Sequence, residues 1–160
     1  MNTMHKLWNE RHQTLRAVFD TSWQLLSIKE QETFTRLAVF RGGFTREAAA
    51  KIAGASLSIL TGLVDKSLIR HDENGRFAVH PVLERYAQEK LASSPKLLNE
   101  IEICHAHYYT EWMARIFAEL KGTRQLDALA DMRIELNNVR DAFSKLIEKV
   151  SSWLKHNHYE

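Results

Sequence analysis

A single β-hairpin signal inside an otherwise helical pattern constrains the fold of this chain most. Two short stretches rich in Ile, Val and Phe, residues 67–71 and 76–80, flank the turn Asp72-Glu73-Asn74-Gly75. Asn-Gly suits the positive φ angles of a tight hairpin turn better than any other dipeptide. No other stretch carries a convincing β signal. The sequence therefore predicts one hairpin inserted among helices.

Helical patterns occupy the chain before this hairpin. An apolar face at residues 15–26 is followed by three short predicted helices at residues 27–41, 45–53 and 56–68. Their start and stop signals are the capping box of Ser27 with Glu30, the pair Gly42-Gly43, Thr45, Gly54, and Ser56 or Ser58. Three helices followed by a hairpin is the element order of a winged helix, so we predict a three-helix core with a hairpin wing.

The chain beyond the hairpin is predicted to be entirely helical. Pro81 suits the first turn of a helix that runs to Ala92, and Ser93-Ser94-Pro95 is the clearest linker. A helix from about Leu97 to Lys121 and a second one with a break near Asn137-Asn138 follow. The fold class is thus mainly α, with a winged-helix domain at 11–92 and an all-α helical hairpin, similar to a tetratricopeptide repeat, at 96–156.

Composition limits the partners and the compartment. The 160 residues contain 22 Lys and Arg against 20 Asp and Glu, a net charge of +2, so bulk charge favours neither a nucleic acid nor a membrane. The single Cys104 excludes an internal disulfide and favours a reducing compartment. No apolar run reaches 18 residues, and residues 1–13 lack a signal-peptide core. We expect a cytoplasmic protein with no membrane contact.

Catalytic and metal-binding patterns are missing from the sequence. It contains no GxxxxGK[ST], GxGxxG, GxSxG or HExxH motif, and its Asp and Glu residues follow helix-surface spacings typical of solvated faces. His105 and His107 point about 200° apart on a helix, and His156 and His158 lie in a tail predicted to fray. Cys104 falls on an apolar stripe, which predicts a small buried side chain. We therefore expect no catalytic residue, no metal site and no enzymatic activity.

The third predicted helix, at residues 56–68, carries few side chains that read DNA. Its charged residues are one Asp65 and one Lys66, and it contains no Arg, Asn or Gln. Base edges and phosphates are recognised mainly by such basic and amide side chains. The helix therefore favours protein contact, and direct DNA binding by this segment is not the main prediction.

Two other functions stay open. In the first, the chain is a small DNA-binding transcription factor whose helical region dimerises. Its wing would contact the DNA phosphates through Arg70, His71 and Arg76.

In the second, the chain is a free-standing helical adaptor. Exposed aromatic side chains would then form a protein-binding face, drawn from Tyr109, Trp112 and Trp153.

Several sequence strings resemble one family of regulators. They are Ser22-Trp23-Gln24-Leu25-Leu26, Leu37-Ala38-Val39-Phe40 leading into Gly42-Gly43-Phe44, Leu63-Val64-Asp65-Lys66-Ser67-Leu68, Phe77-Ala78-Val79-His80, Glu84-Arg85-Tyr86-Ala87, His105-Ala106-His107-Tyr108-Tyr109, and residues 135–143. Together they resemble the winged-helix region of bacterial STAND signalling ATPases, which are NB-ARC-like and often LuxR-type transcriptional regulators, and the helices that lead into their tetratricopeptide-like repeats. The resemblance covers about residues 11–150.

This resemblance implies a nucleotide-dependent role for one residue. In the family, the winged helix packs on the nucleotide-binding core and holds the ADP-bound resting state. The histidine that contacts the ADP phosphates maps to His80, although Val79 and Pro81 depart from the usual Met and Asp beside it. The implied partner is the nucleotide-binding domain of a longer parent chain that uses ADP and ATP with magnesium. Downstream repeats would sense a protein or small-molecule signal. The phosphate-loop domain should precede Arg11 and is not in this sequence, so we expect a fragment that binds no cofactor alone.

Overall fold

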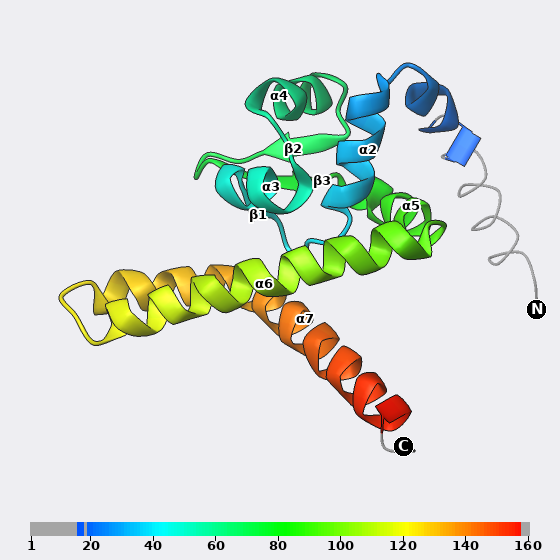
Figure 1. Ribbon diagram of the computed structural model, residues 1–160. Helices are drawn as coiled ribbons and strands as arrows, with labels where there is room; N and C mark the ends of the chain where they lie inside the picture. The colour runs from blue at the N-terminus through cyan, green and yellow to red at the C-terminus, as the bar shows by residue number, and fades with distance from the viewer. Residues whose placement is uncertain (1–15, 18, 158–160) are drawn as a thin grey trace, which may run out of the picture.

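The computed structural model describes residues 16–17 and 19–157, so the predicted apolar positions Leu15 and Val18 lie outside the described residues. A helical stretch at residues 19–24 precedes the numbered elements (Figure 1). These are, in chain order, α2 (Ile28–Leu37), β1 (Phe44–Thr45), α3 (Arg46–Ala53), α4 (Leu57–Asp65), β2 (Ile69–His71), β3 (Arg76–Val79), α5 (Pro81–Ala92), α6 (Pro95–Leu120) and α7 (Gln125–Asn157). The predicted fold class is confirmed: a winged helix is followed by an all-α region.

Side-chain caps fix where the short helices begin. The Ser27 hydroxyl accepts a hydrogen bond from the Glu30 backbone N–H at 3.3 Å, and the Glu30 carboxylate accepts one from the Ser27 N–H at 2.8 Å. Thr45 caps α3. Ser56 rather than Ser58 caps α4 through the Ile59 N–H, at 3.2 Å. Each cap satisfies an N–H that has no partner within its own helix.

The helix predicted at residues 27–41 ends before the Gly42-Gly43 pair. We expected it to reach Arg41, but α2 ends at Leu37, and residues 38–40 continue as a turn. Gly42 and Gly43 instead shape the loop, with φ angles of +81° and +97°. A Cβ on Gly43 would lie 2.9 Å from the backbone oxygen of Phe77. Glycine is therefore required here by close approach to the wing as well as by its φ angle.

The wing is a three-stranded antiparallel sheet, not a lone hairpin. The predicted hairpin is confirmed, with Ile69 opposite Val79, but a further strand, β1, pairs with the other edge of β3. The strand order is β1-β3-β2. We missed β1 because two residues cannot display the alternation by which a strand is recognised. Its pairing is a consequence of the Gly42-Gly43 loop, which brings Phe44 opposite Phe77.

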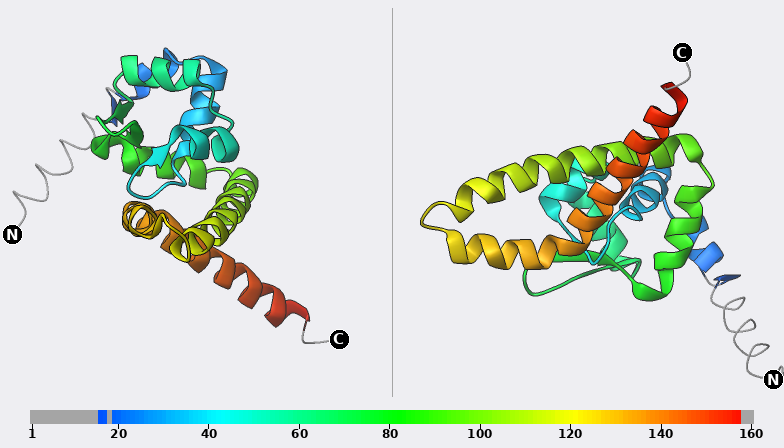
Figure 2. Two further views of the ribbon diagram at one scale, coloured as in Figure 1. Left: turned by 90° about the vertical axis from the view of Figure 1, so that its left-hand side faces the viewer. Right: turned by 90° about the horizontal axis from the view of Figure 1, so that it is seen from below.

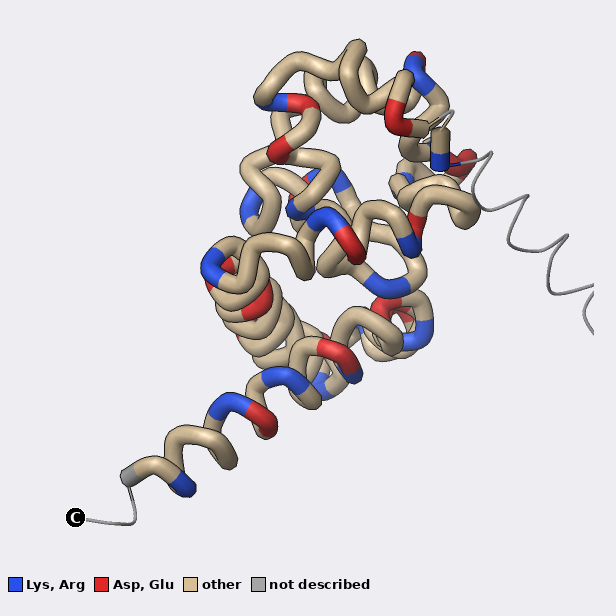
Figure 3. The backbone as a smooth tube through the Cα atoms, turned by 90° about the vertical axis from the view of Figure 1, so that its right-hand side faces the viewer, with Lys and Arg blue, Asp and Glu red and all other residues tan. Residues whose placement is uncertain are grey.

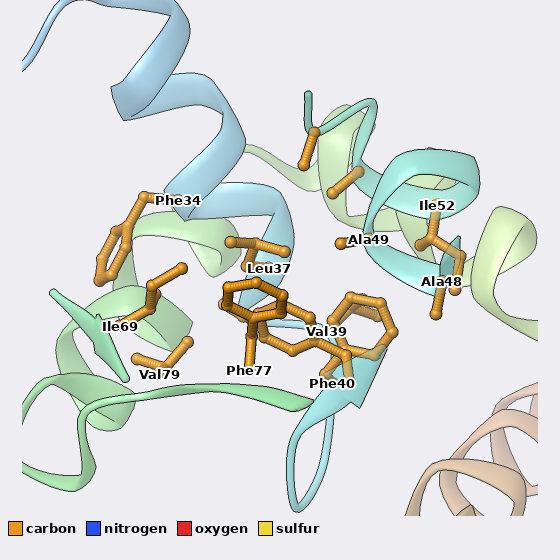
Figure 4. Packing of buried hydrophobic residues seen from close by; sticks show 14 of the residues in the cluster. Phe34, Leu37, Val39, Phe40, Ala48, Ala49, Ile52, Ile69, Phe77 and Val79 are labelled. Atoms are coloured by element: carbon orange, nitrogen blue, oxygen red, sulfur yellow. The ribbon is translucent and has the colours of Figure 1, made fainter. Parts of the chain in front are cut away.

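The core of the winged helix lies between the three helices and the sheet. Figure 4 shows Phe34, Leu37, Ile69 and Val79 meeting at its centre, and all four are buried. A second aromatic group, Phe19, Trp23 and Tyr86, joins the helical stretch at residues 19–24 to α5. Burial of these apolar surfaces is the main favourable term in the stability of the domain.

Two long helices pass beneath the winged helix (Figures 1 and 2). Only Ser93 and Ser94 separate α5 from α6, and α6 packs against α2, α3 and α5 as well as α7. The predicted break near Asn137-Asn138 is wrong, because α7 is continuous from Gln125 to Asn157. Asparagine lowers helix propensity only slightly, and Asn138 is held by tertiary hydrogen bonds. No described helix is by itself long and apolar enough to cross a membrane.

Candidate functional site

His80 stands at the surface where the wing meets α5. Its backbone N–H donates to the Leu68 oxygen at 3.0 Å, which fixes the residue at the end of β3. It occupies the N-cap position of α5, with Pro81 next, but its side chain makes no capping hydrogen bond. The imidazole is therefore exposed beside a helix N-terminus, where a hydrogen bond to an anion is favourable. Glu84 in the first turn adds an opposing negative charge.

The exposed surface of α4 offers little that could bind DNA. Leu57 is 47% exposed, Ser58 and Thr61 are small, and Asp65 is the one charged residue of the helix. Lys66, which follows α4, forms an ion pair with Glu30 of α2. The hydrogen bond from Lys66 is the largest cause of the lowered pKa of the Glu30 carboxyl. The Lys66 ammonium is therefore paired with a carboxylate of this chain. The described surface of α4 thus presents few side chains suited to base edges or phosphates.

The wing supplies two exposed basic side chains, not three. Arg70 and His71 of β2 are exposed. Arg76 of β3 was expected to grip phosphate, but its side chain is 14% exposed and forms an ion pair with Glu135. Asp72 lies in the turn itself, where it accepts hydrogen bonds from the Asn74 and Arg76 backbone N–H groups. Acidic and basic residues are interspersed along the described chain (Figure 3).

A buried polar network joins the wing to the two long helices. Arg76 pairs with Glu135 of α7, and the Tyr109 hydroxyl of α6 donates to the same carboxylate at 2.8 Å. Asn138 donates to Glu135 at 2.9 Å and to the Gly43 oxygen at 2.8 Å. Its own oxygen accepts from the Arg41 N–H at 2.6 Å. We refer to Arg41, Gly43, Arg76, Tyr109, Glu135 and Asn138 as the interlayer network.

The sequence did not predict this network. We expected Asp and Glu to lie on solvated faces, yet Glu135 is 5% exposed and Glu30 is 9% exposed. Burial and the nearby Glu135 carboxylate raise the pKa of Tyr109, which keeps its hydroxyl protonated as a donor. A buried carboxylate needs a cation and further donors to offset its lost hydration. Arg76, Tyr109 and Asn138 meet that need from three different elements.

An open groove borders the interlayer network. It encloses about 450 Å³ between the loop after α2, α5 and α7. Arg41 forms an ion pair with Asp141 across this groove, at 3.6 Å. The lining residues are Phe40, Arg41, Gly42, Glu84, Gln88, Asn137, Arg140, Asp141 and Ser144. Its two arginines and two carboxylates balance one another in charge.

Helix α6 places its cysteine differently from our expectation. Cys104 was expected to be buried but is exposed, whereas His105 is 1% exposed. The buried stripe passes through Ile101, His105 and Trp112, which leaves Cys104 to one side. As predicted, His105 and His107 point in different directions, since the first is buried and the second is exposed. Within residues 16–17 and 19–157, no group of three His, Cys, Asp or Glu is placed to hold a metal ion.

The structure also corrects the predictions of a frayed C-terminal tail and of an exposed aromatic adaptor face. His156, expected in a frayed tail, lies within α7 and contacts the Ser152 oxygen at 2.8 Å, while His158 lies outside the described residues. Of the three aromatic residues proposed for an adaptor face, Tyr109 and Trp112 are buried against the core. Only Trp153 is largely exposed, at 64%. The proposed aromatic face is therefore wrong for two of its three members.

Protonation of His105 should weaken the fold. Burial, and then the positive charge of Arg41, lowers the pKa of His105 from 6.5 to about 4. Asn138, Glu135 and Glu102 act in the opposite direction. Because the unfolded chain takes up this proton first, stability is full above pH 6.5 and is lost as the pH falls toward 4.

We expect His105 to account for a loss of about 1 kcal/mol of unfolding free energy between pH 7.5 and 5.5. Urea unfolding at both pH values measures this loss. His105→Phe should make the pH dependence shallower by that amount, while His107→Gln, at an exposed position on the same helix, should leave it unchanged. An equal pH dependence in His105→Phe and the unaltered chain would contradict the assignment.

Comparison with known proteins finds relatives in mycobacteria. Two of them are named "Putative HTH-type transcriptional regulator Rv0890c", from Mycobacterium tuberculosis, and "Putative HTH-type transcriptional regulator Mb0914c", from Mycobacterium bovis. Each is 37% identical over 145 residues, covering 84% of this chain but 16% of the relative. No protein-family model and no solved structure matches the chain. The winged helix and its two long helices are thus similar to one segment of much longer proteins named as HTH-type transcriptional regulators.

Proposed function

We propose that this chain is the winged-helix regulatory module of a STAND-type transcriptional regulator and acts through protein contact. The observation that carries the proposal is the surface of α4, the helix that enters the DNA groove in DNA-binding winged helices. Asp65 is its one charged residue, and the neighbouring Lys66 is paired with Glu30. The similarity to regulators supports the regulatory role, and the surface chemistry favours a protein partner.

The proposed partner is the nucleotide-binding domain of the parent polypeptide, and His80 is the proposed contact to ADP. A protonated or neutral imidazole can donate one hydrogen bond to a phosphate oxygen, and the α5 N-terminus favours negative charge beside it. His80 therefore fits a single phosphate contact. Glu84 adds opposing charge, so the remaining phosphate ligands and the magnesium ligands must come from the partner domain. In this proposal the chain itself catalyses no reaction.

The proposed mechanism is a gated equilibrium between a closed and an open arrangement. The His80 contact would exist only in the closed arrangement, so ADP would favour that state by its differential affinity. Each factor of ten in that preference corresponds to about 1.4 kcal/mol. A signal received by downstream repeats would act by favouring the open state, in which the winged helix has rotated away.

Isolation of the native gene product that carries this segment tests the proposal. Its intact mass is measured, and the supernatant released by acid is chromatographed for adenine nucleotide. We expect a polypeptide well above 18.6 kDa with ADP in near-stoichiometric amount. His80→Ala should lower that occupancy, while His71→Ala, an exposed histidine on the wing, should not. A product of 18.6 kDa without nucleotide would overturn the proposal.

Direct DNA binding is the second candidate, and the names of the relatives favour it. In this case exposed Arg70 and His71 would contact phosphate, without Arg76. Fluorescence anisotropy with a 30-base-pair duplex, at 50 and 200 mM salt, distinguishes the candidates. A DNA-binding chain should lose affinity steeply with salt and weaken on Arg70→Ala. A protein-contacting module should show no saturable binding to the duplex at either salt concentration, and Arg70→Ala should change nothing.

A further inference from the structure

The outer face of α7 carries an apolar stripe that nothing within the described chain covers. Its members are Leu136, Phe143, Ile147, Val150 and Leu154, with exposures between 37% and 64%. At about 100° per residue these five positions fall within a sector of about 60°. The opposite side of the helix is used internally, because Lys145 and Lys149 pair with Glu102 of α6, while Glu135, Asn138 and Ala142 are buried.

The spacing of this outer stripe is that of a coiled-coil seam. Its members are separated by seven, four, three and four residues, which are the alternating three- and four-residue steps of a heptad repeat with one position, residue 140, not apolar. Phe143, Ile147, Val150 and Leu154 fill two successive heptads, and Arg140 holds the seam position before them. One flank consists of Asn137, Ser144 and Ser151, so no charge on that side repels an identical helix.

We propose that this stripe packs against the same stripe of a second copy of the chain, with the two α7 helices antiparallel. A parallel pair would bring Arg140 against its own copy. In the antiparallel pair, Phe143 of one copy meets Leu154 of the other, and Arg140 lies beside the C-terminal end of the other α7. The partial negative charge at that helix end favours an arginine, while the basic Lys155 and His156 in the last turn oppose it. This proposal is independent of nucleotide binding and of His80.

The shape of the molecule permits this arrangement. The C-terminal half of α7 leads away from the winged helix (Figures 1 and 2), so an antiparallel pair keeps the two winged helices at opposite ends. Phe143, Ile147, Val150 and Leu154, with Leu146 and Trp153 at their border, expose on the order of 600 Å² per copy, somewhat below the roughly 800 Å² per partner of a standard interface. The pair is isologous, so assembly closes at two copies.

Sedimentation equilibrium of the full 160-residue chain between 1 and 200 μM tests the pairing. We expect a mass that rises with concentration toward twice 18.6 kDa. Ile147→Glu should weaken association at least 30-fold because it places a charge in the seam. Val82→Glu is the matched control, since Val82 is 53% exposed on α5. Circular dichroism checks that both variants keep the helical content.

Two results would overturn the proposal. One is a monomer at all concentrations; if Ile147→Glu then destabilises that monomer, another part of the same chain covers the stripe. The other is a dimer that Val82→Glu weakens and Ile147→Glu does not.

Disulfide trapping tests the orientation. In a Cys104→Ser background, equimolar Ser144→Cys and Ser151→Cys chains should give mainly the mixed disulfide. A majority of 144–144 and 151–151 products would overturn the antiparallel arrangement.

Discussion

In urea unfolding at pH 7.5, the Glu135→Ala variant is expected to lose about 3–5 kcal/mol of unfolding free energy. The change leaves the Arg76 guanidinium buried without its carboxylate, and Nη2 of Arg76 already has no hydrogen-bond partner. It also removes the acceptor for the Tyr109 hydroxyl. A domain of this size is stabilised by about 5–15 kcal/mol in total, so the wing should separate from α6 and α7 under mild conditions.

Two further variants separate the charge effect from a general effect on α7. Glu148→Ala removes an exposed carboxylate from the same helix and should change the unfolding free energy by less than about 0.5 kcal/mol. The double variant Arg76→Met with Glu135→Leu removes both charges and should recover the part of the loss that comes from the unpaired charge, although the Tyr109 hydroxyl and the Asn138 amide still lack their acceptor. If the double variant is as unstable as Glu135→Ala, the ion pair does not account for the effect.

The Phe34→Ala variant is expected to lose a similar amount, about 3–5 kcal/mol, for a different reason. Phe34 is fully buried, and its ring lies 5.8 Å from Phe19 and 6.1 Å from Trp23, centre to centre. Truncation removes the apolar contacts and leaves a cavity between α2 and the helical stretch at residues 19–24. Thermal unfolding followed by circular dichroism should show a midpoint lowered by more than about 10 °C.

Phe117→Ala is the matched control for this core variant. It makes the same chemical change at a position of α6 that is 54% exposed, so its midpoint should move by only a few degrees. Equal losses in the two variants would mean that Phe34 does not sit in the packed core described above.

Local signals predicted the winged helix well because each depends on neighbouring residues. The Ser27 and Glu30 capping box and Thr45 perform their expected roles within four residues of themselves. Asn74-Gly75 lies in the hairpin turn as expected, but only Gly75 of the two has a positive φ angle. The break at Asn137-Asn138 was wrong because propensity is a weak signal that tertiary hydrogen bonds easily override. Cys104 was misplaced because steps of three and of four residues both keep a helical stripe, and the buried position after Ile101 is His105, four residues on, and not Cys104.

The candidate sites also include one feature that local sequence signals predict and one that depends on tertiary contacts. The exposure of His80 at the start of α5 follows from the hairpin and Pro81, both of which are visible in the sequence. In the DNA-binding alternative, Arg76 was predicted to be a free phosphate ligand. This prediction was wrong because the position of Arg76 on a strand does not reveal that α7 passes beside it. Its partner Glu135 is separated by 59 residues, and no local pattern links the two.

By itself, the sequence determined the order and type of nearly all the elements, because caps, turn residues and apolar periodicity act over a few residues. Only the tertiary structure decided that β1 joins the sheet and that Arg76 and Glu135 form a buried pair. It also decided which face of α7 is left bare. These features depend on contacts between distant segments, whose energies come from desolvation and packing in three dimensions.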